Sequence, residues 1–147
     1  MDCKDLMIGD WVRFKENYPQ KELQGKIAKV KGVRGRIDVR TQDGEYYESE
    51  HPDWLEPIPL TEEILVKNGF EYAYNEVSKM QNKQLLIANI DGHYIEIRLD
   101  KKNIAIWYDY YENESDFYCD VFLPLPYYVQ GFQHLLRLCG IEKELTI

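Results

Sequence analysis

Short apolar runs separated by Gly, Asp and Pro occupy the first 59 residues of the chain. The alternation is clearest where Ile37, Val39 and Thr41 alternate with charged residues, which is the period of a half-buried strand. Asp43-Gly44 then supplies a dipeptide that favours a tight hairpin. Because no helical pattern interrupts them, these runs predict a small all-β unit with strands at 11–14, 25–33, 35–42, 45–48 and 54–58.

A short helix is predicted between residues 61 and 68. Thr61 can cap the amides of the first turn, and the acids Glu62 and Glu63 lie where the helix dipole favours negative charge. Gly69 supplies a left-handed stop, with Phe70 placed to fold back onto the helix. This helix marks the boundary between the two halves of the chain.

From residue 84 onward the pattern changes to an antiparallel meander. The runs QLLIANI at 84–90 and HYIEIRL at 93–99 flank Asp91-Gly92, which favours a two-residue hairpin turn. Two further alternating runs follow at 103–109 and 117–123. Each of these four strands has one apolar face, and such a sheet requires a cover.

A helix at the end of the sequence is predicted to provide this cover. At 100° per residue, one broad apolar stripe contains Tyr128, Phe132, Leu135, Leu136 and Cys139. The opposite side collects the polar residues Gln130, Gln133, His134 and Arg137. We therefore expect Cys139 to lie in the core as an inert thiol and His134 to point away from it, so that the two do not form a reactive pair.

Together these patterns predict an α+β protein with two domains. Residues 1–59 are expected to form a small SH3-like β-barrel, because G-D-W-V-R-F, G-K-I-A-K-V and D-W-L-E-P-I resemble the strands of such barrels. Residues 60–147 are expected to hold the short helix, a four-stranded antiparallel sheet and the C-terminal helix.

The composition is typical of a compact soluble protein. With 147 residues, 44% hydrophobic content and 12 tyrosines, the chain can bury a sizeable core. No stretch approaches the ~20 apolar residues that a membrane span needs, and the sequence does not begin with an apolar run of signal-peptide length. The three cysteines lie far apart without a C-x-x-C pair, so we expect reduced thiols, a cytoplasmic location and no membrane contact.

Charge is distributed unevenly, although the formal net charge is −8. One group of basic residues, here called the basic strip, consists of Lys26, Lys29, Lys31, Arg34, Arg36 and Arg40. Residues 41–63 then hold eight acids and no Lys or Arg. One interpretation of the strip is a surface for nucleic-acid backbone, which the net charge disfavours. The interpretation that we favour is a solvated hairpin whose basic residues pair with the acidic neighbouring strand.

Motifs for the common catalytic and cofactor sites are missing from the sequence. These are the zinc motif H-E-x-x-H, the phosphate loop G-x-x-x-x-G-K-[ST], the nucleophile elbow G-x-S-x-G and the dinucleotide loop G-x-G-x-x-G. The acidic segment 109–120 lacks the glycine and ligand order of an EF-hand, so we interpret it as a solvated loop. The sequence therefore predicts no enzyme activity, no catalytic residue, no cofactor and no metal site.

Aromatic and polar side chains indicate contact with another protein instead. Tyrosine is enriched at protein interfaces, although tyrosines at strand positions can also simply cover a sheet. The candidate contact residues are Tyr46, Tyr47, Tyr108, Tyr110, Tyr111, Gln130, His134 and Arg137. The sequence thus predicts a non-enzymatic interaction module that docks a protein partner or a second copy of itself. The alternative is a nucleic-acid-binding accessory protein that uses the basic strip.

Three segments in a fixed order resemble one group of proteins. They are D-L-x-x-G-D-W-V near the start, I-P-L-T-E-E-I-L-V-K-N-G-F in mid-chain and Y-V-Q-G-F-Q-H-L-L-R-L-C-G-I near the end. This arrangement is similar to small uncharacterised proteins of Bacteroides-type gut bacteria and their prophages or other mobile elements. In those proteins the last helix commonly carries a histidine where Gln130 stands here, so no role for that histidine transfers. The resemblance implies no known reaction.

Overall fold

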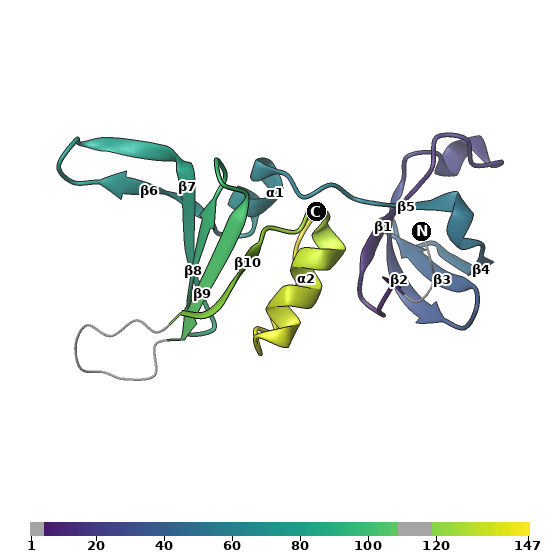
Figure 1. Ribbon diagram of the computed structural model, residues 1–147. Helices are drawn as coiled ribbons and strands as arrows, with labels where there is room; N and C mark the ends of the chain where they lie inside the picture. The colour runs from purple at the N-terminus through teal and green to yellow at the C-terminus, as the bar shows by residue number, and fades with distance from the viewer. Residues whose placement is uncertain (1–4, 109–118) are drawn as a thin grey trace. The chain divides into compact units, whose positions relative to one another are not determined.

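The chain folds into two compact units, each built on a five-stranded antiparallel sheet (Figure 1). The computed structural model describes residues 5–108 and 119–147, without the side chains of residues 108 and 119–122. The first unit comprises residues 1–59 with 128–133, and the second comprises residues 60–127 with 134–147. Strands predominate and two α-helices are described, so the predicted mixed α+β class is confirmed.

Five strands and two 3-10 helices are described in the first unit between residues 5 and 59. In chain order they are β1 (Trp11–Phe14), η2 (Lys21–Leu23), β2 (Ile27–Val33), β3 (Ile37–Thr41), β4 (Tyr46–Glu50), η3 (Pro52–Trp54) and β5 (Leu55–Pro57). The remaining elements are α1 (Glu62–Lys67), β6 (Glu71–Asn75), β7 (Met80–Ile90), β8 (His93–Arg98), β9 (Asn103–Tyr108), β10 (Cys119–Pro124) and α2 (Val129–Leu138).

One face of the first sheet is buried in a hydrophobic core. Along β3 the buried residues are Ile37, Val39 and Thr41, which is the alternation that the sequence predicted. The ring of Tyr18 packs edge-on against Phe14, with ring centroids 4.8 Å apart. The core consists of Leu6, Val12, Phe14, Tyr18, Leu23, Ala28, Val30, Ile37, Val39 and Leu55, with Val33, Tyr47 and Trp54 packed against it.

The strand order of the first sheet is β4-β3-β2-β1-β5, so the last strand returns to pair with the first. β4 and β5 are the two edges, and no ladder joins them among the residues that the structure describes. β5 is only three residues long and ends at Pro57, which has no amide hydrogen to extend a ladder. A closed barrel is therefore not present, and the predicted SH3-like barrel is not confirmed.

The second sheet has the order β10-β9-β8-β7-β6, one strand more than the four predicted. Its centre follows the predicted meander, with Asp91-Gly92 joining β7 to β8 in direct register. Along β8 the side chains of Ile95 and Ile97 are buried, whereas Arg98 is exposed, as the alternation indicated. The additional strand is β6, which pairs with an N-terminal extension of β7.

The β6–β7 hairpin extends beyond the ends of β8 and β9 (Figure 1). Its outer part is exposed on both faces, including Tyr74, Val77 and Met80. Because neither face is buried, the segment carries no alternation of apolar and polar residues, and the sequence therefore did not predict β6 or the start of β7.

The predicted helix near residue 61 is confirmed as α1. The Thr61 hydroxyl oxygen accepts a hydrogen bond from the Ile64 amide at 3.4 Å, and Gly69 adopts a left-handed φ of 93°. The amide of buried Phe70 donates back to the Leu65 carbonyl at 3.1 Å, which closes the helix.

Asn68, at the C-terminal end of α1, ties this helix to the last residues of the chain. Its side-chain amide donates to the carbonyls of Ile64 at 2.7 Å and Thr146 at 2.8 Å. Its side-chain oxygen accepts from the Thr146 amide at 2.8 Å. Asn68 itself is buried, so the three bonds are partly shielded from water.

The C-terminal helix α2 is present, but its buried stripe is rotated from the predicted one. Gln133, predicted to lie on the polar side, is buried, and Tyr128 and Leu138 are exposed. Cys139 follows the end of the helix and is only half-buried, so its predicted place in the core is wrong. Val129, Phe132 and Leu136 are fully buried, and Gln133 lies on the same side of the helix as Val129 and Leu136. The centre of the buried stripe is therefore on the side of α2 that carries Gln133.

Candidate interaction surface

A row of four side chains crosses the outer face of the first sheet, opposite its core. Trp11 on β1 is the register partner of Lys29 on β2, and Lys29 is the partner of Arg40 on β3. Arg40 in turn lies opposite Tyr46 on β4. Directly opposite residues of antiparallel strands project from the same face, so the four side chains are neighbours. We call Trp11, Lys29, Arg40 and Tyr46 the cation–aromatic row.

The two cations of the row each lie over a ring of the row. The Lys29 Nζ atom is 5.4 Å from the centroid of the Trp11 ring, and the Arg40 guanidinium carbon is 5.8 Å from the centroid of the Tyr46 ring. Both distances are within the range of cation–π attraction. Arg40 is exposed, Trp11 and Lys29 are half-buried, and 46% of the Tyr46 surface is accessible, so the row can contact a partner.

Acids border the row on both sides. Towards β5, Arg13 forms an ion pair with Glu56, with its Nη2 atom 2.6 Å from the Glu56 Oε1 atom. On β3, Asp38 lies two residues from Arg40, and its carboxylate accepts a hydrogen bond from the Ser49 amide at 2.9 Å. The positive charge at the centre of this face is therefore confined to a narrow band.

Lys26 is a member of the basic strip that pairs with the acidic strand region, as the favoured interpretation expected. Its Nζ atom lies 2.7 Å from Asp43 and 3.7 Å from Glu45. The hydrogen bond between Lys26 and Asp43 raises the pKa of Lys26 and lowers the pKa of Asp43. Tyr47 donates a hydrogen bond to the same Glu45 at 2.8 Å, and that bond raises the pKa of Tyr47.

The rest of the basic strip behaves differently. No acid of the described residues lies within ion-pair distance of Lys31, Arg34, Arg36 or Arg40. Lys31 is exposed, and Arg36 donates to the Ser49 carbonyl at 3.2 Å. In the described part of the chain, these four residues therefore differ from Lys26, which pairs with the acidic strand region.

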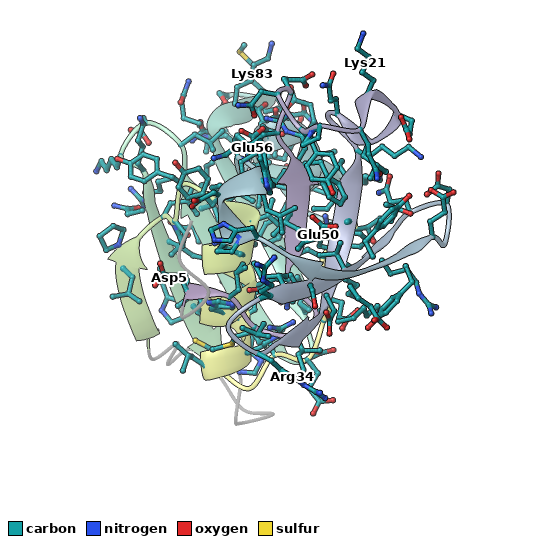
Figure 2. The ribbon with its side chains drawn as sticks, turned by 90° about the vertical axis from the view of Figure 1, so that its right-hand side faces the viewer. Asp5, Lys21, Arg34, Glu50, Glu56 and Lys83 are labelled. Carbon is teal, nitrogen blue, oxygen red and sulfur yellow. The ribbon has the colours of Figure 1, made fainter. Side chains whose placement is uncertain are left out.

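Arg34 and Arg36 lie at the tip of the β2–β3 hairpin, where Gly35 has a left-handed φ of 80°. Figure 2 shows Arg34 at the end of the first unit that is opposite to Lys21. An open hollow of about 460 Å³ connects this tip to the row, and its lining consists of Arg34, Arg36, Asp38, Tyr46, Glu48 and Ser49. Its charges are balanced, with two arginines against two acids.

Of the predicted tyrosine contacts, the structure describes the side chains of Tyr46 and Tyr47, and these lie on opposite faces of the first sheet. Tyr46 lies in the row, whereas Tyr47 points to the other face and packs against the core. Tyr110, Tyr111 and the side chain of Tyr108 lie outside the described residues, as does most of the acidic segment 109–120. On α2, the predicted contact residues Gln130, His134 and Arg137 are all half-buried.

Trp11 is the member of the row that the sequence analysis did not propose as a contact residue. Its position on an alternating strand indicated an outward side chain, because Val12 and Phe14 are apolar and buried. Its neighbours could not be read from the sequence, since they depend on the register of β1 against β2.

No group of three or more His, Cys, Asp or Glu side chains that could hold a metal occurs in the described part of the chain. Neither of the described α-helices has the length and apolar character needed to cross a membrane. No protein-family model, curated protein or solved structure matches this chain.

Proposed function

We propose that the chain is a non-enzymatic interaction module that docks a protein partner on the cation–aromatic row. Trp, Tyr and Arg are the residue types most enriched at the energetic centres of protein interfaces. The row combines one of each with Lys29, and four different strands supply them. The register of the four strands is the observation that supports the proposal. It brings the four side chains together on the face opposite the core, where the core does not require them.

The finer assignment of the first unit to an SH3-like barrel is part of the proposal. The pairing of β5 with β1 supports it, because it folds the end of the sheet back towards its beginning. Irregular pairing between Val30 and Gly32 and between Ile37 and Val39 also supports it, since bulges increase the twist and bend of a sheet. The likeness to small Bacteroides-type and prophage proteins and the cytoplasmic location stay predictions of the sequence.

A nucleic-acid-binding accessory protein is the second candidate. It is favoured by one observation, the lack of acidic partners around Lys31, Arg34, Arg36 and Arg40 in the described residues. Against it stand the net charge of −8 and the acids on both sides of the row. A backbone-binding protein loses affinity steeply with salt, so this candidate predicts oligonucleotide binding at ~50 mM salt that disappears at ~200 mM.

Site-specific photo-crosslinking in cells that express the full chain tests the proposal. A benzophenone amino acid replaces Tyr46 in one variant and Tyr74 in the matched control, because Tyr74 is 52% exposed and lies in the second unit. We expect a discrete protein adduct from position 46, none of the same mass from position 74, and loss of the adduct when Lys29→Glu and Arg40→Glu are added.

The mass and chemistry of the adduct distinguish the candidates. An adduct of twice the mass of the chain would identify a second copy as the docked protein, which agrees with the proposal. Identical adducts at both positions, or an adduct that the two charge reversals leave unchanged, would contradict docking on the row. An adduct that nuclease removes would favour the nucleic-acid candidate.

A further inference from the structure

We infer that two copies of this chain associate through the outer edge of β6, which pairs in antiparallel fashion with β6 of the second copy. This contact lies in the second unit and does not depend on the docking proposed for the cation–aromatic row. Its starting point is the place of β6 in the sheet, because β6 is an edge strand and has β7 on one side only.

The outer part of the β6–β7 hairpin is a ribbon of only two strands (Figure 1). β8 pairs with β7 from Leu85 onward, so residues 80–82 have β6 as their one partner strand in the described part of the chain. A two-stranded ribbon is at best marginally stable in water, and Tyr74 is 52% exposed on this one. A further strand beside β6 would extend the ladder of backbone hydrogen bonds and give Tyr74 a cross-strand neighbour.

β6 differs from the other three edge strands of the two sheets. β4 contains the left-handed residue Ser49 between two glutamates, β5 is three residues long and ends at Pro57, and β10 ends at Pro124. Charges, prolines and short or irregular edges are the features by which natural sheets avoid pairing with another chain. β6, which the structure describes in full, has the sequence EYAYN, with no lysine, no proline and no left-handed residue.

The edge of β6 is also continuous, although its pairing with β7 contains an irregular step. The consecutive residues Tyr72 and Ala73 pair with Leu86 and Asn82 of β7, so the extra residues of the bulge belong to β7. Among the described residues, the backbone of residues 71–75 forms no hydrogen bond outside this ladder. The outer edge of β6 can therefore accept another strand.

The sequence of β6 is complementary to itself in one antiparallel register. A twofold axis at Ala73 sets Tyr72 of each copy opposite Tyr74 of the other. The same axis sets Glu71 opposite Asn75, so no like charges face each other. The two tyrosine pairs lie on one face of the joined sheet, because Tyr72 and Tyr74 are two residues apart. Any other register leaves part of the strand unpaired.

The charge of the hairpin also favours a second copy as the occupant. Residues 71–84 contain two acids, Glu71 and Glu76, and two bases, Lys79 and Lys83, so the segment is neutral. Two chains of net charge −8 repel each other, and a neutral hairpin that projects beyond β8 and β9 lets them approach at a low electrostatic cost (Figure 1). The neutral segment and the self-complementary strand therefore point to the same occupant.

Sedimentation velocity of the full chain over a range of concentrations tests the inference. The variants are Ala73→Lys and Ala73→Glu, each of which sets like charges opposite each other at the twofold axis. The matched controls are Gln81→Lys and Gln81→Glu, because Gln81 is exposed on β7 opposite Tyr74 and takes the same charge one strand away from the edge. Thermal unfolding of each variant verifies that the fold is intact.

A contact between five-residue strands is smaller than a standard interface, so we expect a weak dimer that is half formed at about 10–100 μM chain. Ala73→Lys alone and Ala73→Glu alone should each weaken the dimer by about tenfold or more. An equimolar mixture of the two should restore the parent affinity to within about threefold, because opposite charges then face each other at the axis. The Gln81 variants should change the affinity by less than about twofold.

A parent chain that stays monomeric up to about 500 μM would overturn the inference. A loss of the dimer with the Gln81 variants as large as with Ala73→Lys, or a mixture of the two Ala73 variants that stays monomeric, would also overturn it. A dimer that persists in both Ala73 variants but is lost with Arg40→Glu would place the second copy on the row instead. Docking on the row is tested at position 46 and pairing of β6 at position 73, so each can fail without the other.

Discussion

Lys29 and Arg40 lie directly opposite each other on β2 and β3, and each holds its charge over an aromatic ring on the far side. The two effects act on stability with opposite signs, because the like charges repel while the rings attract. The row also concentrates Trp, Arg and Tyr on one face, which supports the proposal that it binds a partner.

Replacing Arg40 with threonine should therefore leave the stability of the protein nearly unchanged. The loss of cation–π attraction to Tyr46 costs about 0.5–1 kcal/mol, and relief of the repulsion from Lys29 returns about 0.2–1 kcal/mol. Urea unfolding of Arg40→Thr should give a free energy of unfolding within about 0.5 kcal/mol of the parent. A loss above about 2 kcal/mol would show that Arg40 has a structural role that the row does not explain.

High pH should reveal the environment of Tyr18. Burial and then the hydrogen bond to Glu50 raise the pKa of Tyr18 from 10.0 to about 12. Tyrosine in the unfolded chain loses its proton first, so the free energy of unfolding should be unaffected by this group below pH 10.0 and should fall between pH 10.0 and about 12. Denaturant unfolding of the parent and of Tyr18→Phe measures the effect, since other tyrosines contribute equally to both chains. Parallel losses over this range would contradict it.

Asn68 should be the most sensitive polar residue of α1. Asn68→Ala removes the side-chain partner of the Ile64 and Thr146 carbonyls and of the Thr146 amide, which should lower the free energy of unfolding by about 2–3 kcal/mol. Hydrogen exchange at the Thr146 amide should accelerate at the same time. The matched control is Asn82→Ala, because the single bond from the Gln84 amide to Asn82 is exposed and should cost less than about 1 kcal/mol. Equal costs at the two positions would contradict this assignment.

Two adjacent residues of α1 test the amphipathic character of the helix. Leu65 is 1% exposed and Val66 is 45% exposed. Leu65→Ala should cost about 2–5 kcal/mol of unfolding free energy through the cavity that it leaves, and Val66→Ala less than about 1 kcal/mol. Urea unfolding of both variants gives the comparison, and similar costs would show that the buried face of α1 is not the one described.

Local signals predicted much of the fold. Asp91-Gly92 and the alternation of Ile95 with Ile97 were sufficient to place β7 against β8, since turn chemistry and periodicity agree there. Thr61 and Gly69 likewise set the limits of α1. The β6–β7 hairpin was missed because its exposed strands need no alternation, and Gln133 was misplaced because a polar residue can be buried on a helix when its amide finds partners.

The candidate site was only partly predictable. Lys29 and Arg40 were identified as basic residues, but their pairing depends on the irregular step between Val30 and Gly32, which sequence alone does not reveal. Trp11 joins the row only through the register of β1 with β2. The assumption that the strip would be neutralised by nearby acids applied to Lys26 and Asp43, where the side chains meet, and not to Arg40, which has no acid at ion-pair distance among the described residues.

The three tryptophan indoles provide the most direct measurement of the central claim, that partners dock on the cation–aromatic row. In the 15N-labelled protein, Trp11 reports on the row, Trp54 on the edge of the first core, and Trp107 on the second sheet. Titration with the protein that is captured by crosslinking at position 46 should shift the indole N–H signal of Trp11 and leave those of Trp54 and Trp107 in place, and Arg40→Glu should abolish the shift. A shift of Trp107 without Trp11, or a Trp11 shift that persists in Arg40→Glu, would contradict docking on the row.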